Sequence, residues 1–185
     1  MRAAMMRMMF FVTMILICGS GCLGRLISEG AGAVTGARGK AVEIQPVRTG
    51  KPLSEYGSVE FESLRSDIGT QVPDEVLRLI PADTLKMLRE DKLFTGGGPP
   101  LRISGQVIHY ETGGAVDKAI GPLQEVIARI TLSDGRSGAA IGEANVIGRA
   151  KSSTASGAQN LAEGCAKGIA GWIRKNHPAA KESKE

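Results

Sequence analysis

The sequence predicts one α+β domain, residues 41–176, in which two helices cover one face of a mostly antiparallel sheet of about four strands. Apolar and polar residues alternate in several segments, a pattern typical of strands with one dry and one solvated face. Two other segments place apolar residues at helical spacing. The order is strand, helix, three strands, helix, and 185 residues leave no room for a second domain of comparable size.

The domain is predicted to begin with a short extended segment followed by a clear strand. Val42, Ile44 and Val47 form the extended segment, which Pro46 restricts to a sheet edge or an arm. The strand runs near residues 58–64 and has alternating apolar and acidic side chains. The apolar residues there are Val59 and Phe61, and the acidic ones are Glu60 and Glu62.

A helix is predicted to start at Pro73, with Asp74 and Glu75 in its first turn. Pro81 is expected to kink or divide this helix, because proline lacks the amide hydrogen that helical bonding needs. The glycines and prolines of residues 96–100 end the region. The expected apolar face consists of Leu77, Ile80, Thr84 and Leu88.

Three strands follow, near residues 101–107, 125–132 and 140–150, and the turn at 133–135 joins the last two in a hairpin. The last strand has small residues on one side, which predicts that a helix packs closely against it. These residues are Gly142, Ala144, Val146 and Gly148.

The final helix is predicted over residues 155–176, with capping residues at 152–154. Cys165 belongs to its apolar side and is expected to be buried core filler. Residues 177–185 are predicted to form a flexible charged tail. The apolar stripe of the helix consists of Leu161, Cys165, Ile169 and either Trp172 or Ile173.

Residues 1–21 read as a secretory signal peptide, with Arg2 and Arg7 before an apolar core at residues 8–17. As a helix this core would measure about 15 Å, too short for a permanent membrane span. The following residues Gly19-Ser20-Gly21-Cys22 resemble a lipobox, although an aliphatic residue is usual at the place of Gly19.

The lipobox resemblance implies cleavage between Gly21 and Cys22 and lipidation of Cys22 with diacylglycerol and a fatty acid such as palmitate. Two or more acyl chains would hold the protein on a membrane lastingly. Cys18 is a poorer candidate, because bulky residues precede it. The alternative is ordinary signal cleavage nearby, which would leave Cys22 a plain thiol. With Cys18 removed and Cys22 acylated, Cys165 is left without an intrachain disulfide partner.

Residues 22–40 are rich in glycine and are predicted to tether the domain to the membrane. The residue after the cysteine is Leu23, where an Asp would resemble the inner-membrane retention signal of enterobacteria. By that analogy the chain is expected on the outer membrane, facing the periplasm. The net charge of +4 falls to about +2 without Arg2 and Arg7, and so small an excess does not indicate nucleic-acid binding.

The segments 101–108, 128–132 and 141–146 resemble a family of bacterial lipoproteins of unknown function. The order of elements is also similar to the small α+β domain of the TolB amino-terminal region and of the curli-secretion lipoprotein. The likeness extends over residues 59–175 and implies an envelope role in assembly or partner binding, without catalytic residues. The pore-forming strands of the curli-secretion protein have no evident counterpart here.

The sequence offers no convergent set of catalytic or metal-binding side chains. His109 is expected on a strand surface and His177 in the tail, so the two with Cys165 do not predict a zinc site. Glu60 and Glu62 could imitate a carboxylate pair, but a solvated strand face explains them better. The glycines of residues 30–36 have the wrong spacing for a dinucleotide fingerprint. No cofactor, metal ion or enzymatic activity is therefore expected.

The favoured hypothesis is a lipid-anchored, non-catalytic module that binds an envelope protein or associates with itself. The alternatives are a periplasmic carrier of a small apolar ligand and, less favoured, an envelope hydrolase. The positions of Ile127, Ile141 and Ile147 distinguish an interface from a carrier. Together on the surface they would favour an interface, and around a cavity they would favour a carrier.

Overall fold

The computed structural model describes residues 37–48, 53–111, 124–150 and 157–178. The predicted signal peptide, the lipobox with Gly21 and Cys22, and the tether up to Gly36 lie outside the described residues. The predicted helix caps at 152–154 and residues 179–185 of the tail also lie outside them.

One five-stranded sheet forms the centre of the fold, with the strand order β1-β5-β4-β3-β2. All neighbouring strands are antiparallel except β2 and β3, which run parallel. The sheet is therefore mixed, and it has one more strand than the sequence indicates. The strands are β1 (Arg38–Gln45), β2 (Ser58–Ser66), β3 (Pro100–Glu111), β4 (Gln124–Asp134) and β5 (Ala140–Ala150).

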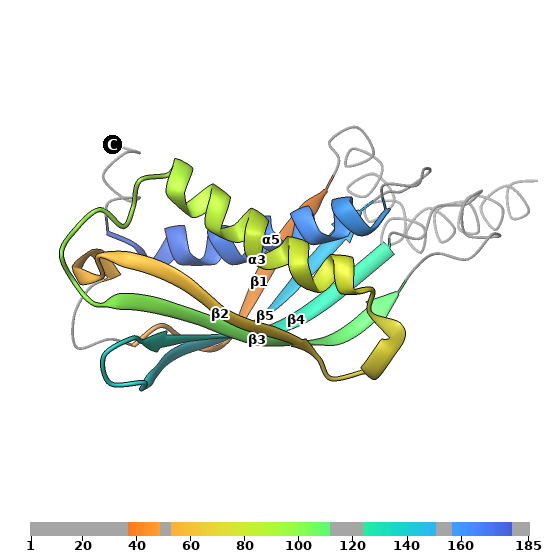
Figure 1. Ribbon diagram of the computed structural model, residues 1–185, viewed down its shortest axis with the longest axis horizontal. Coiled ribbons are helices and arrows are strands. Elements are labelled where there is room, and N and C mark those ends of the chain that lie inside the picture. The colour runs from red at the N-terminus through yellow and green to blue at the C-terminus, as the bar shows by residue number, and fades with distance from the viewer. Residues whose placement is uncertain (1–36, 49–52, 112–123, 151–156, 179–185) are drawn as a thin grey trace, which may run out of the picture. The chain divides into compact units, whose positions relative to one another are not determined.

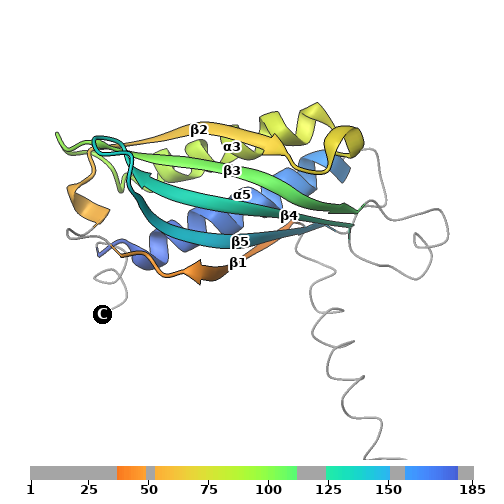
Figure 2. The same cartoon turned by 90° about the horizontal axis from the view of Figure 1, so that it is seen from below.

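Two α-helices of the described chain lie on the same face of this sheet, as Figure 1 and Figure 2 show from two directions. Helix α3 (Asp74–Glu90) packs on β2, and α5 (Gly157–Asn176) packs on β1, β5 and β4. The helices also contact each other. The predicted α+β class and its two layers are confirmed. The short 3-10 turns η2 (Leu53–Glu55) and η3 (Gly69–Gln71) complete the described elements.

The core lies between the two layers, where alternate residues of the central strands meet the helices. The predicted apolar stripe of α5 is buried, including Cys165, which has no exposed surface. Burial raises the pKa of the Cys165 thiol to about 12, so the side chain stays protonated and acts as a core residue. The buried residues of the central strands include Leu101, Ile103, Val107, Val126, Ala128, Ile130, Leu132, Ala144 and Val146.

Helix α3 differs from its prediction in two respects. It is one helix from Asp74 to Glu90, so of the two expected effects of Pro81, a kink or a division, the division is absent. Its buried face contains Val76 where the sequence indicates Leu77, which is only half-buried. The spacing of four residues explains this face, because it continues through Ile80 to Leu88. Packing of this face against the sheet holds the helix together despite the missing amide hydrogen of Pro81.

Glycines allow α5 to approach β1 and β5 at backbone distance. A Cβ atom placed on Gly39 would lie 1.9 Å from the carbonyl oxygen of Gly164, and one on Gly148 would lie 2.5 Å from the amide nitrogen of Cys165. No real Cβ atom tolerates such contacts with backbone, so alanine does not fit at these places. The predicted close packing of a helix on the small residues of 142–148 is confirmed.

Both predicted ends of the domain need correction. Residues 38–40, assigned to the tether, pair with β5 as part of β1. His177, assigned to the flexible tail, is 2% exposed and packs edge-on against Phe94 with 5.3 Å between ring centroids. Phe94 lies in the segment after α3, far from His177 in sequence. This contact anchors the carboxyl end of α5 and could not be inferred from the local sequence.

The burial of His177 predicts that the domain loses stability in mild acid. Neither ring nitrogen has a hydrogen-bond partner among the described residues. Burial lowers the pKa of His177 below its usual 6.5, and the nearby backbone of Leu93 opposes part of this shift. Because the folded pKa is depressed, the unfolded chain takes up a proton first as the pH falls. The stability that neutral His177 contributes is therefore fully present above pH ~6.5 and is lost progressively below it.

Thermal unfolding of the wild type and of His177→Phe, measured between pH 7.5 and pH 5, checks this expectation. Phenylalanine keeps a flat ring against Phe94 but cannot bind a proton. We expect the melting temperature of the wild type to fall more steeply below pH 6.5 than that of the variant. Parallel curves would show that protonation of His177 does not couple to folding, because all other titrating groups are common to both proteins.

Candidate interaction surface

The side chains considered for chemistry lie in separate environments. His109 is exposed on β3 and lies 3.7 Å from the carboxylate of Glu111, whereas Cys165 is inside the core. Glu60 and Glu62 are exposed on β2, as a solvated strand face predicts. No group of three or more His, Cys, Asp or Glu that could hold a metal ion occurs in the described part of the chain.

The face of the sheet that α3 and α5 leave uncovered is polar and crossed by ion pairs. Arg102 on β3 lies 3.8 Å from Glu60 on β2, and Arg129 on β4 lies 3.5 Å from Glu143 on β5. Arg149 donates a hydrogen bond to Glu125 across the same pair of strands. Figure 2 shows this face toward the viewer. Such exposed pairs contribute little stability, but they keep the face charged and hydrated.

A hollow of about 750 Å³ lies on this face, over β2, β3, β4 and β5. Carboxylates, guanidinium groups, hydroxyls and one amide dominate its lining, so it offers little to an apolar ligand. The lining residues include Glu62, Arg65, Gln106, Arg129, Thr131 and Glu143.

The three isoleucines that were to distinguish an interface from a carrier do not gather in one place. Ile127 and Ile147 are directly opposite each other on β4 and β5, half-buried on the uncovered face. Ile141 is 6% exposed and belongs to the core. Its strand is irregular there, since the pairing of β4 with β5 shifts between Leu132 and Ser133. Neither arrangement anticipated from the sequence is therefore present as a whole.

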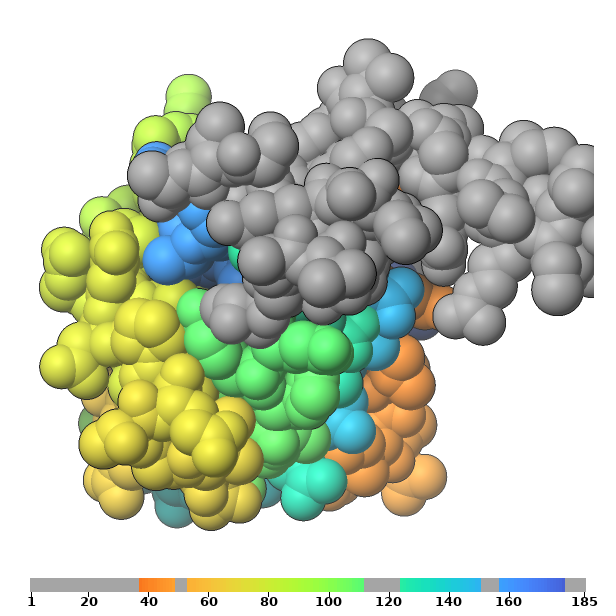
Figure 3. Space-filling view, turned by 90° about the vertical axis from the view of Figure 1, so that its right-hand side faces the viewer, coloured from red at the N-terminus to blue at the C-terminus, as the bar shows by residue number. Residues whose placement is uncertain are grey.

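The apolar pair instead continues to the open edge of the sheet at β1. Val42 pairs with Asn145 and is thus diagonal to Ile147 on the same face. Val42 is 47% exposed and Ile44 is 49% exposed, and they are the large hydrophobic residues that stand out as exposed in the described ranges. We call Ile127, Ile147 and Val42 the apolar strip. It runs from the middle of the uncovered face to an edge strand, a place where partner strands commonly bind. The atoms of β1 form one flank of the surface in Figure 3.

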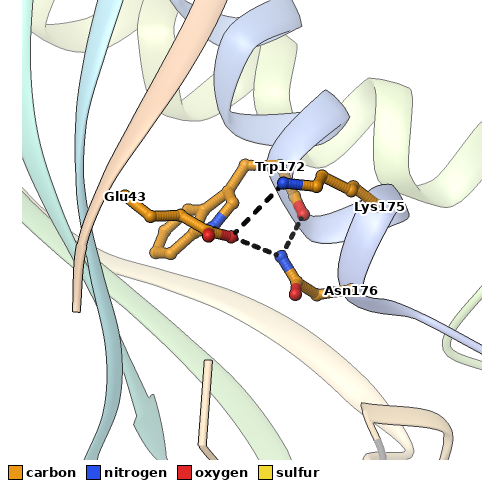
Figure 4. Close-up of polar contacts among 4 residues, drawn as sticks. All are labelled: Glu43, Trp172, Lys175 and Asn176. Carbon is orange, nitrogen blue, oxygen red and sulfur yellow. Dashed lines mark hydrogen bonds and ion pairs between the residues drawn. The ribbon is translucent and has the colours of Figure 1, made fainter. Parts of the chain in front are cut away.

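Glu43 holds β1 onto α5 from the other side of the strand. Its carboxylate accepts hydrogen bonds from the indole nitrogen of Trp172 at 3.1 Å and the amide nitrogen of Asn176 at 3.2 Å. The ammonium nitrogen of Lys175 lies 3.9 Å away, and Figure 4 shows these side chains converging on one carboxylate oxygen. Nearer the start of the strand, Lys167 donates a hydrogen bond to the carbonyl of Ala37 at 3.2 Å.

These contacts hold β1 in place, although it is an edge strand of the sheet. The sequence assigned Trp172 only to an apolar stripe and gave Glu43 no role. The only local sign of this role was that Glu43 is an acidic residue in a mostly apolar segment. Its partners are 129 or more residues away in the chain. Edge strands with fixed backbones are suited to pair with another strand, because less conformational entropy is lost on binding.

Comparison of the sequence with protein-family models gives no match, and comparison with curated proteins gives none either. Comparison with solved structures gives matches. The dodecamer of a PelC variant from Paraburkholderia phytofirmans matches with a TM-score of 0.53 and 16% identity, over 76% of this chain and 98% of that one. The chain has a PelC-like fold. A second PelC dodecamer from the same organism matches with a TM-score of 0.51 and 18% identity, over 71% and 96% of the two chains.

A protein of Caulobacter crescentus CB15 thought to be a lipoprotein matches more distantly, with a TM-score of 0.31 and 14% identity over 68% of this chain and 88% of that one. None of these three structures is the TolB region or the curli-secretion lipoprotein, so that resemblance stays a prediction. None of the described helices is long and apolar enough to cross a membrane.

Proposed function

We propose that this chain is a lipid-anchored, non-catalytic module of the bacterial cell envelope, which acts by assembling with copies of itself or with an envelope protein. The observation that carries the proposal is the apolar strip that reaches the open edge of a rigid sheet at β1. Exposed apolar surface on a fixed strand edge is typical of association sites. The fold supports the same reading, because the PelC structures that it resembles are dodecamers.

The anchoring part of the proposal rests on the lipobox-like residues Gly19-Ser20-Gly21-Cys22. The described domain begins at Ala37, so Cys22 to Gly36 would connect the lipid to the domain. An outer-membrane position facing the periplasm is supported by Leu23 after the cysteine. Anchoring would concentrate copies in two dimensions, and association that is weak in solution would become effective on the membrane.

The non-catalytic part of the proposal is supported by the chemistry of the uncovered face. Its carboxylates are mostly engaged by arginines, as in the pairs of Glu60 with Arg102 and Glu143 with Arg129. A nucleophile, its base and an oxyanion site would have to converge for acyl transfer. The buried thiol of Cys165 is protonated and inaccessible, so it cannot serve as a nucleophile.

Lipid attachment can be tested with the wild type, Cys22→Ala and Cys18→Ala. We expect metabolic labelling with a palmitate analogue to mark the wild type and Cys18→Ala but not Cys22→Ala. Cys18→Ala is a matched control, since it removes a cysteine four positions earlier within the predicted signal peptide. Intact-mass measurement should show cleavage before Cys22 and an uncleaved Cys22→Ala precursor. Label on Cys22→Ala, or its loss from Cys18→Ala, would contradict the assignment.

Assembly can be tested by chemical crosslinking in native cells, affinity purification and mass spectrometry of the wild type and Cys22→Ala. We expect a stoichiometric complex, with copies of the chain or with one envelope protein, that is enriched in the lipidated form. Recovery of uncrosslinked monomer alone from wild-type cells would overturn the assembly proposal.

A further inference from the structure

We infer that two copies of this chain pair through their β1 strands, antiparallel and centred on Val42, so that their sheets join into one. This inference rests on the proposed function and names its partner and its contact surface. In this arrangement Val42 faces its own counterpart, and Lys40 faces Ile44 of the other copy. Ala41 faces Glu43 in the same way on the helix side of the sheet.

The unoccupied edge of β1 gives the backbone basis for this pairing. β1 is the first strand in the sheet order, and in the described residues it forms a ladder with β5 alone. The ladder shifts between Glu43 and Gln45, and Pro46 follows directly. A bulge and a proline both end regular pairing, so the usable edge extends from the start of the strand to Ile44.

The apolar strip explains why the occupant is a strand with apolar residues on the uncovered face. Contacts of Gly39 and Glu43 with α5 show that the odd-numbered residues of β1 up to Glu43 face the helix, so Lys40 and Val42 face away from it. A second β1 strand presents Val42 on that face, next to the half-exposed Val42 of the first. Burial of the two valine side chains against each other is favourable.

The other edge of the sheet does not offer this match. On the uncovered face, β2 presents Glu60 and Glu62, and both are exposed. Pairing β1 of one copy with β2 of the next would set a polar side chain beside Val42, because the residues that β2 presents on this face are polar, and Val42 would gain no apolar contact. The two strands of a symmetric pair match each other on this face, whereas β1 and β2 do not.

Charge selects the direction and the register. On the uncovered face β1 carries the basic residue Lys40, whereas Glu43 lies on the helix side and binds α5. Antiparallel pairing centred on Val42 sets Lys40 beside Ile44 of the other copy, whereas parallel in-register pairing would set the two Lys40 side chains beside each other. Centring on Val42 also keeps the two Glu43 carboxylates from facing each other, which a pairing centred on Glu43 would require.

The length of chain before β1 permits this dimer on one membrane. Antiparallel pairing separates the starts of the two β1 strands by about 27 Å, the length of eight extended residues. Residues 22–37 precede each strand, and sixteen residues can span up to ~55 Å. Two copies anchored at Cys22 could therefore reach the same bilayer from opposite ends of the paired strands.

Disulfide trapping in native membranes tests the inference with the full chain. In the symmetric pair the Cβ atoms at position 42 would be about 4.5–5.5 Å apart, close enough to bridge after oxidation. We expect Val42→Cys to form a covalent homodimer under mild oxidation. The matched control Glu62→Cys, exposed on the opposite edge, should stay monomeric. The wild type should also stay monomeric, because Cys165 is buried and Cys22 carries lipid under the proposed function.

A second variant, Val42→Lys, measures the interface without a crosslink. It places like charges opposite each other and removes two apolar contacts, so we expect at least about a tenfold loss of dimer. Because Val42 is half-exposed, the variant should unfold at a temperature close to that of the wild type, which a thermal melt checks.

The outcomes separate this inference from the proposed function. A bridge only in mixtures of Val42→Cys with Glu62→Cys would replace β1 self-pairing by a head-to-tail contact of β1 with β2. A bridge from position 42 to a different protein would identify a partner strand as the occupant. Crosslinked complexes without any bridge from position 42 would place the interface elsewhere. Each of these results overturns the inference while leaving the assembly function intact, whereas monomer throughout would overturn both.

Discussion

Replacing Gly164 by alanine is expected to destabilise the domain by about 1–3 kcal/mol, the usual cost of overpacking a tight contact. The same substitution at Gly171, two turns further along α5, is expected to stabilise it by up to ~1 kcal/mol. Both glycines lie inside the helix, so both substitutions gain the same helical propensity. The difference between the two variants isolates the contribution of close packing between helix and sheet.

The surroundings of the two glycines explain the opposite signs. A Cβ atom on Gly164 would lie 2.6 Å from the carbonyl oxygen of Arg38 and 3.1 Å from the backbone nitrogen and oxygen of Arg149. Backbone atoms of two sheet strands cannot move aside without loss of their ladder. A Cβ atom on Gly171 would have no described heavy atom within 4 Å. Alanine there meets open space and only reduces the freedom of the unfolded chain.

Urea unfolding of the wild type and the two variants, followed by circular dichroism, measures both changes. Equal effects of the two substitutions would show that α5 does not depend on backbone-distance contact with β1 and β5. Similar m-values for the three proteins would establish that the midpoints report stability and not a change in the unfolded chain.

Asp134→Ala is expected to cost about 2–4 kcal/mol of stability, because the buried hydroxyl of Tyr56 and two backbone amides of the turn would lose their acceptor at once. The Asp134 side chain closes the β4–β5 turn. Its Oδ1 atom accepts hydrogen bonds from the backbone nitrogens of Arg136 at 2.9 Å and Ser137 at 2.8 Å. Its Oδ2 atom accepts a hydrogen bond from the Tyr56 hydroxyl at 3.0 Å.

Tyr56→Phe serves as the graded control for this site. It removes the hydroxyl but keeps the ring, which is 1% exposed, so we expect a loss of about 1 kcal/mol. Burial and the hydrogen bond to Asp134 raise the pKa of Tyr56 to about 12, and the hydroxyl therefore remains a donor at neutral pH. Thermal unfolding of both variants checks the order of the effects. If Tyr56→Phe costs as much as Asp134→Ala, the turn contacts of Asp134 contribute little.

The local pattern of the sequence was sufficient for the elements and for the layers. Period-two alternation located β2, β3, β4 and β5, because one face of each strand meets the core and the other meets water. The small residues of 142–148 correctly indicated that a helix packs at backbone distance. Burial of Cys165 followed from its place on the apolar side of α5. Each of these properties depends on residues that are near one another in the chain.

Which strands pair with each other depends on the tertiary structure. The sheet is mostly antiparallel, as the sequence indicated, but the sequence did not show which pair is parallel. β2 and β3 are parallel because α3 carries the chain back over the sheet between them. The segment around Val42 had too few alternating residues to be recognised as a full strand. It becomes β1 because β5 offers it a ladder and α5 holds Glu43.

Exposure at the candidate surface and burial at the carboxyl end also depend on the tertiary structure. Exposure of Val42 and Ile44 depends on β1 being at an edge, and burial of His177 depends on Phe94, which arrives from the segment after α3. Local periodicity determines which residues of an element share a face. Burial, ion pairing and the open edge depend on which distant element arrives at that face, and only packing of the whole chain determines this.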